Sequence, residues 1–529
     1  MTYILIPGRH HMLTTFMHQY FLDVLDGKER LLDGASLLGD NVTLVWAITS
    51  SNHSNTRRNP FPGHRREAAL ELFCEDLPAP SLVHHITDIG MSERFARYIV
   101  NSVEVSSRGQ VRMTPENTVI ATSTPEMIGY FQAEGFQRFL PIEIEALDPF
   151  SLKVRRAWEV LTAIVQSGQE WQNSAVYKSE AHKSTKTIIE KYGLMQQLID
   201  VYEDPLGGQE GDLTATRDYE VYRAAFDQGA ERKYGLVDRY IVPGRIVDVG
   251  CATGSIIKKM SFDPRLHESD LYGVELARPL YVRCVQAKDN GEFGNENVFF
   301  YQRNIMQGQL FPTDSVQTTT SFSLTHEIDS YLGRDSLLSF LRRVYEQTAE
   351  GGVYLNVDVV GPEEPDKPVL LWLNHEDGSD DDGRTFEHDD QPAYTEYLLG
   401  LSTLGRFKRF MKDFRAEEGD GIQPEIVERG GKFYARLRHA DASEFMQTKD
   451  YVQSWFSEMH ERFCFWSLSE WKNQLETAGF SVHPDSHVFV NDWIVENRLK
   501  GKVALFEDAD GELKELPTPP QTVVLIATK

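Results

Sequence analysis

Residues 244–255, GRIVDVGCATGS, combine an acidic side chain with closely spaced glycines. Asp248 lies between two valines in a β-favouring run, and Gly250 and Gly254 follow it. Glycine allows unusual backbone dihedrals and the close approach of a ligand, and a helix from about Ile256 would offer free N–H groups. The stretch therefore predicts a buried strand and a turn against which a nucleoside cofactor can lie.

Polar residues also end the strands expected further along the chain. LYGVEL carries Glu275 about 20 residues beyond the turn, a separation at which a carboxylate can hold a ribose diol. VFFYQRNI ends in Arg303 and Asn304, whose polar groups can meet an adenine edge. A fourth strand, TTTSFSLTHEIDSY, passes from apolar to polar residues.

With this ordered set, the region Tyr219–Val360 resembles the class I S-adenosylmethionine-dependent methyltransferases. The resemblance implies methyl transfer from the sulfonium of S-adenosylmethionine. It assigns the ribose hydroxyls to Glu275 and the adenine to Asn304, where the family more often has Asp. It assigns the methionine side of the cofactor to Asp248, Gly250, Cys251 and Gly254.

His326 and Glu327 follow the fourth of these strands. The carboxyl end of a strand in an open α/β sheet faces the ligand crevice, so both side chains are expected near the transferring methyl group. A histidine with a pKa near 6.5 can accept the proton lost by a hydroxyl or amine nucleophile. The two residues are therefore candidate catalytic residues, with capping of the next helix or support of a loop as the alternative.

The N-terminal part begins with another strand, turn and helix. YILIP, residues 3–7, predicts a buried strand, Gly8 a turn, and the apolar spacing after it a helix. Arg9 follows the turn, and a basic loop, TRRNPFPGHR, follows the next strand. A nucleotide can bind at such a turn. His10 and His11 are adjacent, and exposed turn histidines are favoured over a metal pair.

About 205 N-terminal residues resemble the archaeal type of nicotinamide-nucleotide adenylyltransferase, through GR and TFMH, the TRRNPFPGHR loop and SLKVRR. The resemblance implies ATP with Mg²⁺, and His18 as a catalytic contact to the triphosphate. Met17 stands where the family has glycine, so binding without catalysis is the alternative. The implied nucleotide-binding residues are Gly8, Arg9, Thr15, Asn59, Arg65, Ser151 and Arg156.

Alternation of strands and helices predicts an α/β fold with two doubly wound parallel-sheet (Rossmann-like) domains. We expect a nucleotidylyltransferase-like domain over residues 1–205, a Gly- and acid-rich linker over 206–218, and the methyltransferase domain over 219–529. The second domain carries a large α-rich insert at about 361–455, which is expected to cover the substrate crevice. Ser467 and Glu470 have the spacing of a capping box.

Composition places the chain among ordinary globular proteins, since 41% of its 529 residues are hydrophobic and 25% are charged. A net charge of -26 makes nucleic acid an unfavourable partner. Four cysteines without CxxC spacing suggest neither disulfides nor zinc knuckles, and the acidic run HEDGSDDDGRTFEHDD is expected to be a solvated loop. We predict no metal site, no membrane span and a cytoplasmic protein.

The predicted function is an S-adenosylmethionine-dependent methyltransferase fused to a nucleotidylyltransferase-like domain, acting on a small-molecule or nucleotide-linked acceptor. A second enzymatic activity, nucleotidylyl transfer by the N-terminal domain, is an additional expectation. One alternative makes the N-terminal domain a non-catalytic module that binds or recruits a nucleotide. Another is an RNA methyltransferase. The sequence carries no signal for the acceptor atom, for an intermediate shared between the two sites, or for the oligomeric state.

Overall fold

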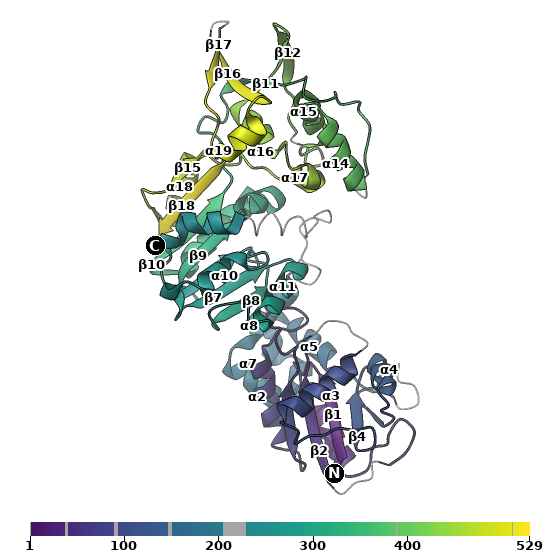
Figure 1. Cartoon of the computed structure of the whole chain (residues 1–529). Helices are drawn as coiled ribbons and strands as arrows, with labels where there is room; N and C mark the ends of the chain where they lie inside the picture. Colours follow the sequence, from purple (N-terminus) through teal and green to yellow (C-terminus); the bar gives the residue numbers. More distant parts are fainter. Residues whose placement is uncertain are drawn as a thin grey trace. The chain divides into compact units, whose positions relative to one another are not determined.

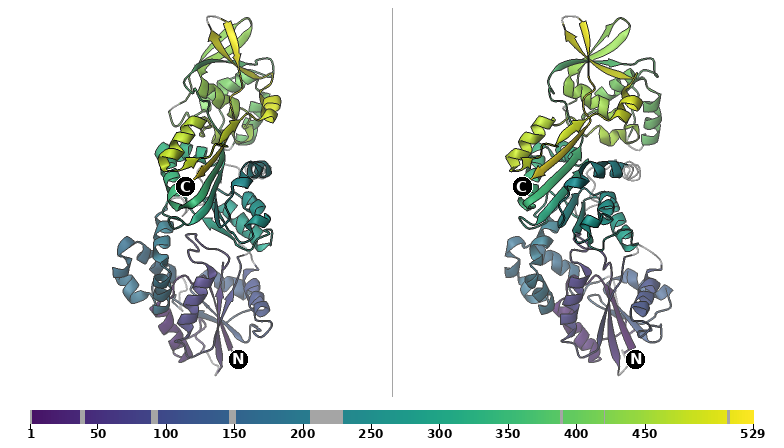
Figure 2. Two further views of the ribbon diagram at one scale, coloured as in Figure 1. Left: turned by 90° about the vertical axis from the view of Figure 1, so that its left-hand side faces the viewer. Right: turned by 60° about the vertical axis from the view of Figure 1, so that its left-hand side comes forward.

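Two compact units divide the chain, Met1–Gln209 and Glu210–Lys529. The structure, a computed structural model, describes residues 2–36, 41–88, 94–145, 151–204, 229–387, 390–419, 421–509 and 512–529. The predicted linker at 206–218 lies outside the described residues. Each unit contains a sheet with parallel strands and helices on both faces (Figures 1 and 2), in agreement with the predicted α/β, doubly wound fold.

The five strands of the first unit are all parallel, in the order β3-β2-β1-β4-β5. Because the order reverses at β1, the carboxyl ends of β1 and β4 form a topological switch point, the place where open α/β sheets bind ligands. The strands are β1 (Thr2–Gly8), β2 (Val42–Ile48), β3 (Ser81–His85), β4 (Thr118–Thr122) and β5 (Phe139–Pro141).

Apolar runs such as YILIP are buried on both faces of this sheet, as parallel strands require. One face packs on α3 (Phe95–Ser106) and α4 (Pro125–Ala133). The helices on the other face are α1 (Thr15–Leu25), α2 (Gly63–Cys74), α5 (Ala157–Val165), α6 (Ala175–Glu180), α7 (Lys183–Lys191) and α8 (Leu194–Glu203).

The main sheet of the second unit has the order β14-β18-β10-β9-β6-β7-β8, with β15 also paired to β18. Strands β6 to β10 are parallel, and β18 runs antiparallel to β10. The switch point lies between β6 and β9. The strands are β6 (Arg245–Val249), β7 (Asp270–Glu275), β8 (Val298–Gln302), β9 (Val316–Phe322), β10 (Thr348–Asp358), β14 (Ser481–Val482), β15 (His487–Phe489) and β18 (Thr522–Thr528).

Helices cover both faces of this sheet as well (Figure 2). One face packs on α10 (Ser255–Ser261) and α11 (Arg278–Asp289). The other packs on α13 (Arg334–Gln347) and α18 (Leu468–Ala478). Short α12 (Thr325–Glu327) links β9 to α13 and carries two of the candidate catalytic residues.

The insertion contains the predicted helices and, in addition, an antiparallel sheet in the order β12-β13-β11-β16-β17. Its last two strands extend it beyond the predicted end at residue 455, because they come from residues 503–516. The helices are α14 (Gln391–Gly400), α15 (Thr403–Asp413), α16 (His439–Thr448) and α17 (Trp455–Glu458). The strands are β11 (Pro368–Leu373), β12 (Glu425–Arg429), β13 (Lys432–Arg438), β16 (Val503–Ala509) and β17 (Glu512–Leu516).

Residues 391–413 of the insertion form two consecutive helices, α14 and α15. Ser402 begins the second helix by accepting a hydrogen bond from the Gly405 N–H at 3.0 Å. The aromatic side chains of α15 enter the core of the insertion, where Phe407 and Phe410 are fully buried. Among the described residues, none of the helices is both long and apolar enough to cross a membrane.

Candidate functional site

The glycine-rich turn follows β6 as the sequence predicts and leads into α10. Gly250 and Gly254 have φ angles of +68° and +78°, in the left-handed region that favours glycine. A Cβ at Gly250 would lie 2.9 Å from the side chain of Leu324, so the turn also packs tightly against the segment after β9. The positive φ angle at each position therefore favours glycine over any residue with a side chain.

Asp248 lies at the base of this turn and is almost completely buried. Its Oδ1 accepts a hydrogen bond from the Thr320 hydroxyl at 2.7 Å, while its buried Oδ2 has no hydrogen-bond partner among the described residues. Burial raises the pKa of Asp248 to about 7, against the lowering effect of the Thr320 hydrogen bond. A buried carboxylate oxygen without a donor is costly, so a cationic or hydrogen-bonding ligand would stabilise it.

Glu275 ends β7 and ties this strand to the glycine-rich turn. Its carboxylate accepts hydrogen bonds from the Ala252 N–H at 2.9 Å and the Ala277 N–H at 2.8 Å. Burial raises its pKa to about 7, although these backbone donors act in the opposite direction. Each carboxylate oxygen can accept a second hydrogen bond, so Glu275 retains the capacity to bind a ribose hydroxyl.

Asn304 and Cys251 are placed differently with respect to this edge. Asn304 follows β8, next to the end of β7, since the Arg303 N–H donates to the Glu275 carbonyl at 3.1 Å. The Asn304 Oδ1 accepts from the Met306 N–H at 2.9 Å.

The Cys251 side chain packs in the hydrophobic core with Cys284. The backbone of Cys251 belongs to the glycine-rich turn, so any contact of this residue with the cofactor would be made by its backbone.

His326 is buried between two carboxylates. Its Nδ1 lies 2.6 Å from Asp358 Oδ1, at the end of β10, and its Nε2 lies 3.3 Å from Glu461 Oε2, in the segment between α17 and α18. The second oxygen of Asp358 accepts from the Thr325 N–H at 2.7 Å. The imidazole therefore joins two strand ends to a segment more than 100 residues away.

This arrangement corrects the expectation of a histidine with a pKa near 6.5. Burial alone would lower the pKa of His326, but the carboxylates of Asp358 and Glu461 outweigh burial and raise it well above the usual value. The imidazolium form is thus favoured at neutral pH, and both ring nitrogens are held. Of the two roles that the sequence leaves open, the geometry favours holding the structure over accepting a proton.

The sequence-based prediction did not include Lys233, which belongs to the helical segment 229–237. Its Nζ donates to the Ser323 hydroxyl at 2.9 Å. Burial lowers the pKa of Lys233 to about 8, and the nearby carboxylates of Asp358, Glu327 and Asp248 oppose this shift. Lys233 therefore lies among the acidic residues of the switch point.

The sequence-based prediction also missed Glu461, because its segment lacks any motif. Asp358 could have been found, because the strand LNVDVV has a polar residue near its end.

A cavity of about 390 Å³ opens between the end of β10 and the insertion. The segment 461–465 separates it from His326, because Glu461 and Phe463 contact the histidine while Arg462 lines the cavity. Charged side chains of both signs face this space: Asp366, Arg438, Asp441, Glu444 and Arg462.

In the first unit, part of the predicted nucleotide set lies at the switch point. Gly8 ends β1, and the guanidinium of Arg9 donates to the Arg58 carbonyl at 2.7 Å. Asn59 is buried beside His11, with 3.4 Å between Asn59 Oδ1 and His11 Nε2. Ser151 and Arg156 lie in the loop after β5, where Arg156 precedes α5.

Arg66 braces these loops through carbonyl groups. Its Nη1 donates to Arg9 and Thr49 at 3.1 and 2.9 Å, and its Nη2 donates to Ser50 at 2.8 Å. Burial, followed by repulsion from Arg9, lowers the pKa of Arg66 to about 9. The carbonyl groups that accept from this buried guanidinium are neutral, so the region carries positive charge suited to an anion.

Three other residues of the predicted set, Thr15, Arg65 and His18, contact other parts of the first unit. The Thr15 hydroxyl donates to the Ser179 carbonyl at 3.0 Å, and the Arg65 guanidinium stacks 3.4 Å from the centre of the Tyr192 ring. His18 packs against His182, with 4.8 Å between the ring centroids. These contacts hold Thr15, His18 and Arg65 within the first unit, and the nucleotide-binding and catalytic roles assigned to them stay predictions.

Comparisons with known proteins give matches of low similarity. No protein-family model matches the chain, and no curated protein matches its sequence. Similar solved structures include an S-adenosylmethionine-dependent methyltransferase from Mesorhizobium loti, with 13% identity, coverage of 57% of this chain and 100% of that chain, and a TM-score of 0.30. One from Clostridium acetobutylicum has 11% identity, coverage of 59% and 98%, and a TM-score of 0.29. Similarity at this level does not decide the function of this chain.

Proposed function

We propose that the second unit is an S-adenosylmethionine-dependent methyltransferase. The observation that carries this proposal is the buried Oδ2 of Asp248, which has no hydrogen-bond partner among the described residues and lies beside a glycine-rich turn at a topological switch point. Glu275 ends β7 and Asn304 follows β8, the next two strands along the same edge of the sheet. The motif resemblance supports the same cofactor.

Each of these residues has a proposed role toward the cofactor. When bound, S-adenosylmethionine supplies a methyl group on a sulfonium. Asp248 would accept hydrogen bonds from the ammonium of the methionine part, and Glu275 would accept them from the ribose hydroxyls. Asn304 would face the adenine. Four carboxylates near this edge, those of Asp248, Glu275, Glu327 and Asp358, favour a ligand that carries positive charge.

We place the methyl acceptor on the side of Lys233 and Glu327. A lysine whose pKa is about 8 is partly neutral near physiological pH, so it can accept the proton that the nucleophile loses. His326 acts as a positioning residue, because its two ion pairs hold Glu461 and the start of α12. The acceptor that we propose is a small molecule or a nucleotide-linked metabolite.

Titration calorimetry with the full chain tests this proposal. S-adenosylmethionine and S-adenosylhomocysteine are expected to bind one site, and Asp248→Asn should weaken both by about 10- to 100-fold, since a hydrogen bond to a charged group contributes about 1.5–3 kcal/mol. Glu268→Gln, a change at an exposed carboxylate of the same unit, is the matched control. Equal affinity of the wild type and Asp248→Asn would remove the assigned site.

For the first unit we propose a nucleotide- or anion-binding module without adenylyl transfer. The buried charge of Arg66 favours binding, whereas His18 lies with His182 and not with Arg9. With Mg-ATP and nicotinamide mononucleotide, the purified chain should release no pyrophosphate above background. Pyrophosphate release that is lost in His18→Ala would contradict this role and establish a second enzyme activity.

A further inference from the structure

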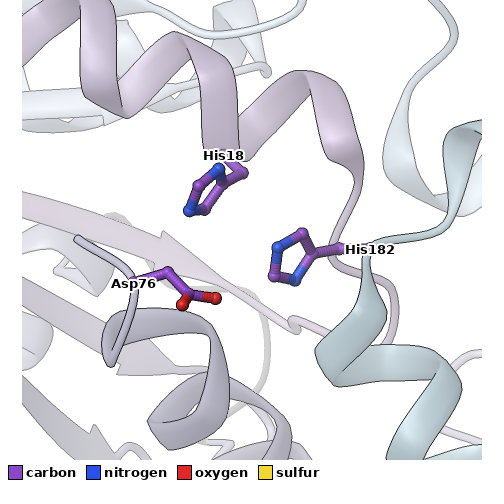
Figure 3. Close-up of side chains that lie close together, drawn as sticks. All are labelled: His18, Asp76 and His182. Carbon is purple, nitrogen blue, oxygen red and sulfur yellow. The ribbon is translucent and has the colours of Figure 1, made fainter.

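Three metal-ligating side chains of the first unit face one another (Figure 3). They are His18 in the first turns of α1, Asp76 just after α2, and His182 just before α7. One potential ligand atom from each lies within 4.8 Å of the other two. Distant parts of the sequence therefore supply a compact His, Asp, His set.

The hydrogen-bonding groups of these histidines are incompletely satisfied by protein. The buried Nε2 of His18 has no hydrogen-bond partner among the described residues. His182 is buried, and its Nδ1 lies 2.9 Å from the Ser184 hydroxyl and accepts from the Ser184 N–H at 3.3 Å, so its Nε2 is the ring nitrogen that faces the cluster. A metal-bound histidine typically donates its other ring N–H to a neighbouring oxygen. Metal binding at Nε2 would therefore place the ring proton on Nδ1, which would donate to the Ser184 hydroxyl in place of accepting from the Ser184 N–H.

The ring geometry of His18 and His182 is compatible with a shared ion. The two imidazole planes are only 19° apart, and their centroids are separated by 4.8 Å. Two imidazoles on one tetrahedral ion, with Zn–N distances of about 2.0–2.1 Å, have centroids about 5 Å apart. Coordination would require side-chain rotations that bring the three ligand atoms, which lie within 4.8 Å of one another, onto one ion.

We propose that His18, Asp76 and His182 bind a divalent transition metal of the zinc class. Two imidazoles and one carboxylate are typical ligands of such an ion, and water would complete the coordination. Lys183 lies 2.6 Å from Asp76 Oδ2, but its side chain is 70% exposed, so this ion pair is weak and the second carboxylate oxygen remains for the metal.

Such an ion would connect α1, the end of α2 and the start of α7. It would also explain the position of His18, whose motif suggests a phosphate contact but whose neighbours are Asp76, His182 and Phe73. The sequence alone predicts no metal site because the three residues lie far apart in the chain and form no spaced motif.

Cobalt substitution gives a readout that is independent of any enzyme activity. The full chain, freed of metal and titrated with Co²⁺, should bind about one equivalent and show the intense visible absorption of a tetrahedral centre, which Zn²⁺ then abolishes by displacement. Zn²⁺ should also raise the melting temperature of the first unit. His64, exposed on α2, provides the control variant His64→Ala, which should behave as the wild type.

The variants Asp76→Asn and His182→Gln keep side-chain volume and separate metal binding from folding. Each should retain the circular dichroism spectrum of the metal-free protein, while Co²⁺ absorption is lost and Zn²⁺ affinity falls at least 10-fold. The proposal is overturned if the wild type binds neither ion, or if both variants bind Co²⁺ with the wild-type spectrum and affinity.

Discussion

Asp248 is buried and has an incomplete set of hydrogen bonds, so the stability of the ligand-free protein depends on pH. Its folded-state pKa of about 7 exceeds the value of about 3.9 expected when the chain is unfolded. Stability from this group is therefore complete below about pH 4 and is lost as the pH rises through 7. In the ligand-free state the ionised carboxylate therefore costs folding free energy, and a ligand that donates hydrogen bonds to it would offset this cost.

Replacing Asp248 by asparagine should remove that cost. We expect Asp248→Asn to be more stable than the wild type at pH 8, by on the order of 1–4 kcal/mol, and nearly equal to it at pH 4.5. Urea unfolding at the two pH values measures the difference, with Glu268→Gln as a control that changes neither. A variant less stable than the wild type at pH 8 would contradict the assigned burial and charge.

His326 provides the opposite case, a cation between two buried carboxylates. His326→Ala leaves Asp358 and Glu461 buried without their shared partner, and we expect a loss of about 3–5 kcal/mol at pH 7. Thermal or urea unfolding measures it, beside the exposed control His267→Ala. A loss below about 1 kcal/mol would show that the two ion pairs contribute little.

Side chains at strand ends could be predicted from the sequence, and partners brought by distant elements could not. Asp248, Glu275 and Asn304 follow apolar strands, and the parallel sheet places those ends on one edge. Glu461 and Lys233 reach the same region from segments without a motif. The burial of the Cys251 side chain beside Cys284 could not be predicted, because the sequence places a residue in a turn without fixing the direction of its side chain.

At the scale of elements, local signals were the most reliable. The predicted capping box of α18 is confirmed: the Ser467 hydroxyl accepts from the Glu470 N–H at 3.3 Å, and the Glu470 carboxylate accepts from the Ser467 N–H at 2.8 Å. The antiparallel sheet of the insertion was missed because strands such as EIVER and ELKEL are short, charged and partly exposed.

The cap gives a prediction for a single element. Ser467→Ala should destabilise the second unit by about 1 kcal/mol, because it removes one acceptor for the free N–H groups at the start of α18. Ser469→Ala, at an exposed position in the same helix, serves as the matched control. Comparable loss in the two variants, measured by thermal unfolding, would show that the cap is unimportant.

At the scale of the whole molecule, the chain joins two units built on the same principle but with different electrostatics. The switch point of the first unit carries Arg9 and Arg66, whereas that of the second carries Asp248, Glu275 and Asp358. An anionic ligand suits the first and a cationic ligand the second. The doubly wound fold was predictable because strands and helices alternate. The nucleotide contacts predicted for the first unit depend in addition on side-chain directions, which the sequence does not fix.

A crystal structure of the full chain with S-adenosylhomocysteine tests the central claim most directly. We predict that the amino group of the ligand lies within hydrogen-bond distance of Asp248 Oδ2 and that its ribose hydroxyls contact Glu275. The adenine should lie beside Asn304. A ligand bound elsewhere on the second unit, or crystals that remain free of it at saturating concentration, would contradict the proposed methyltransferase site.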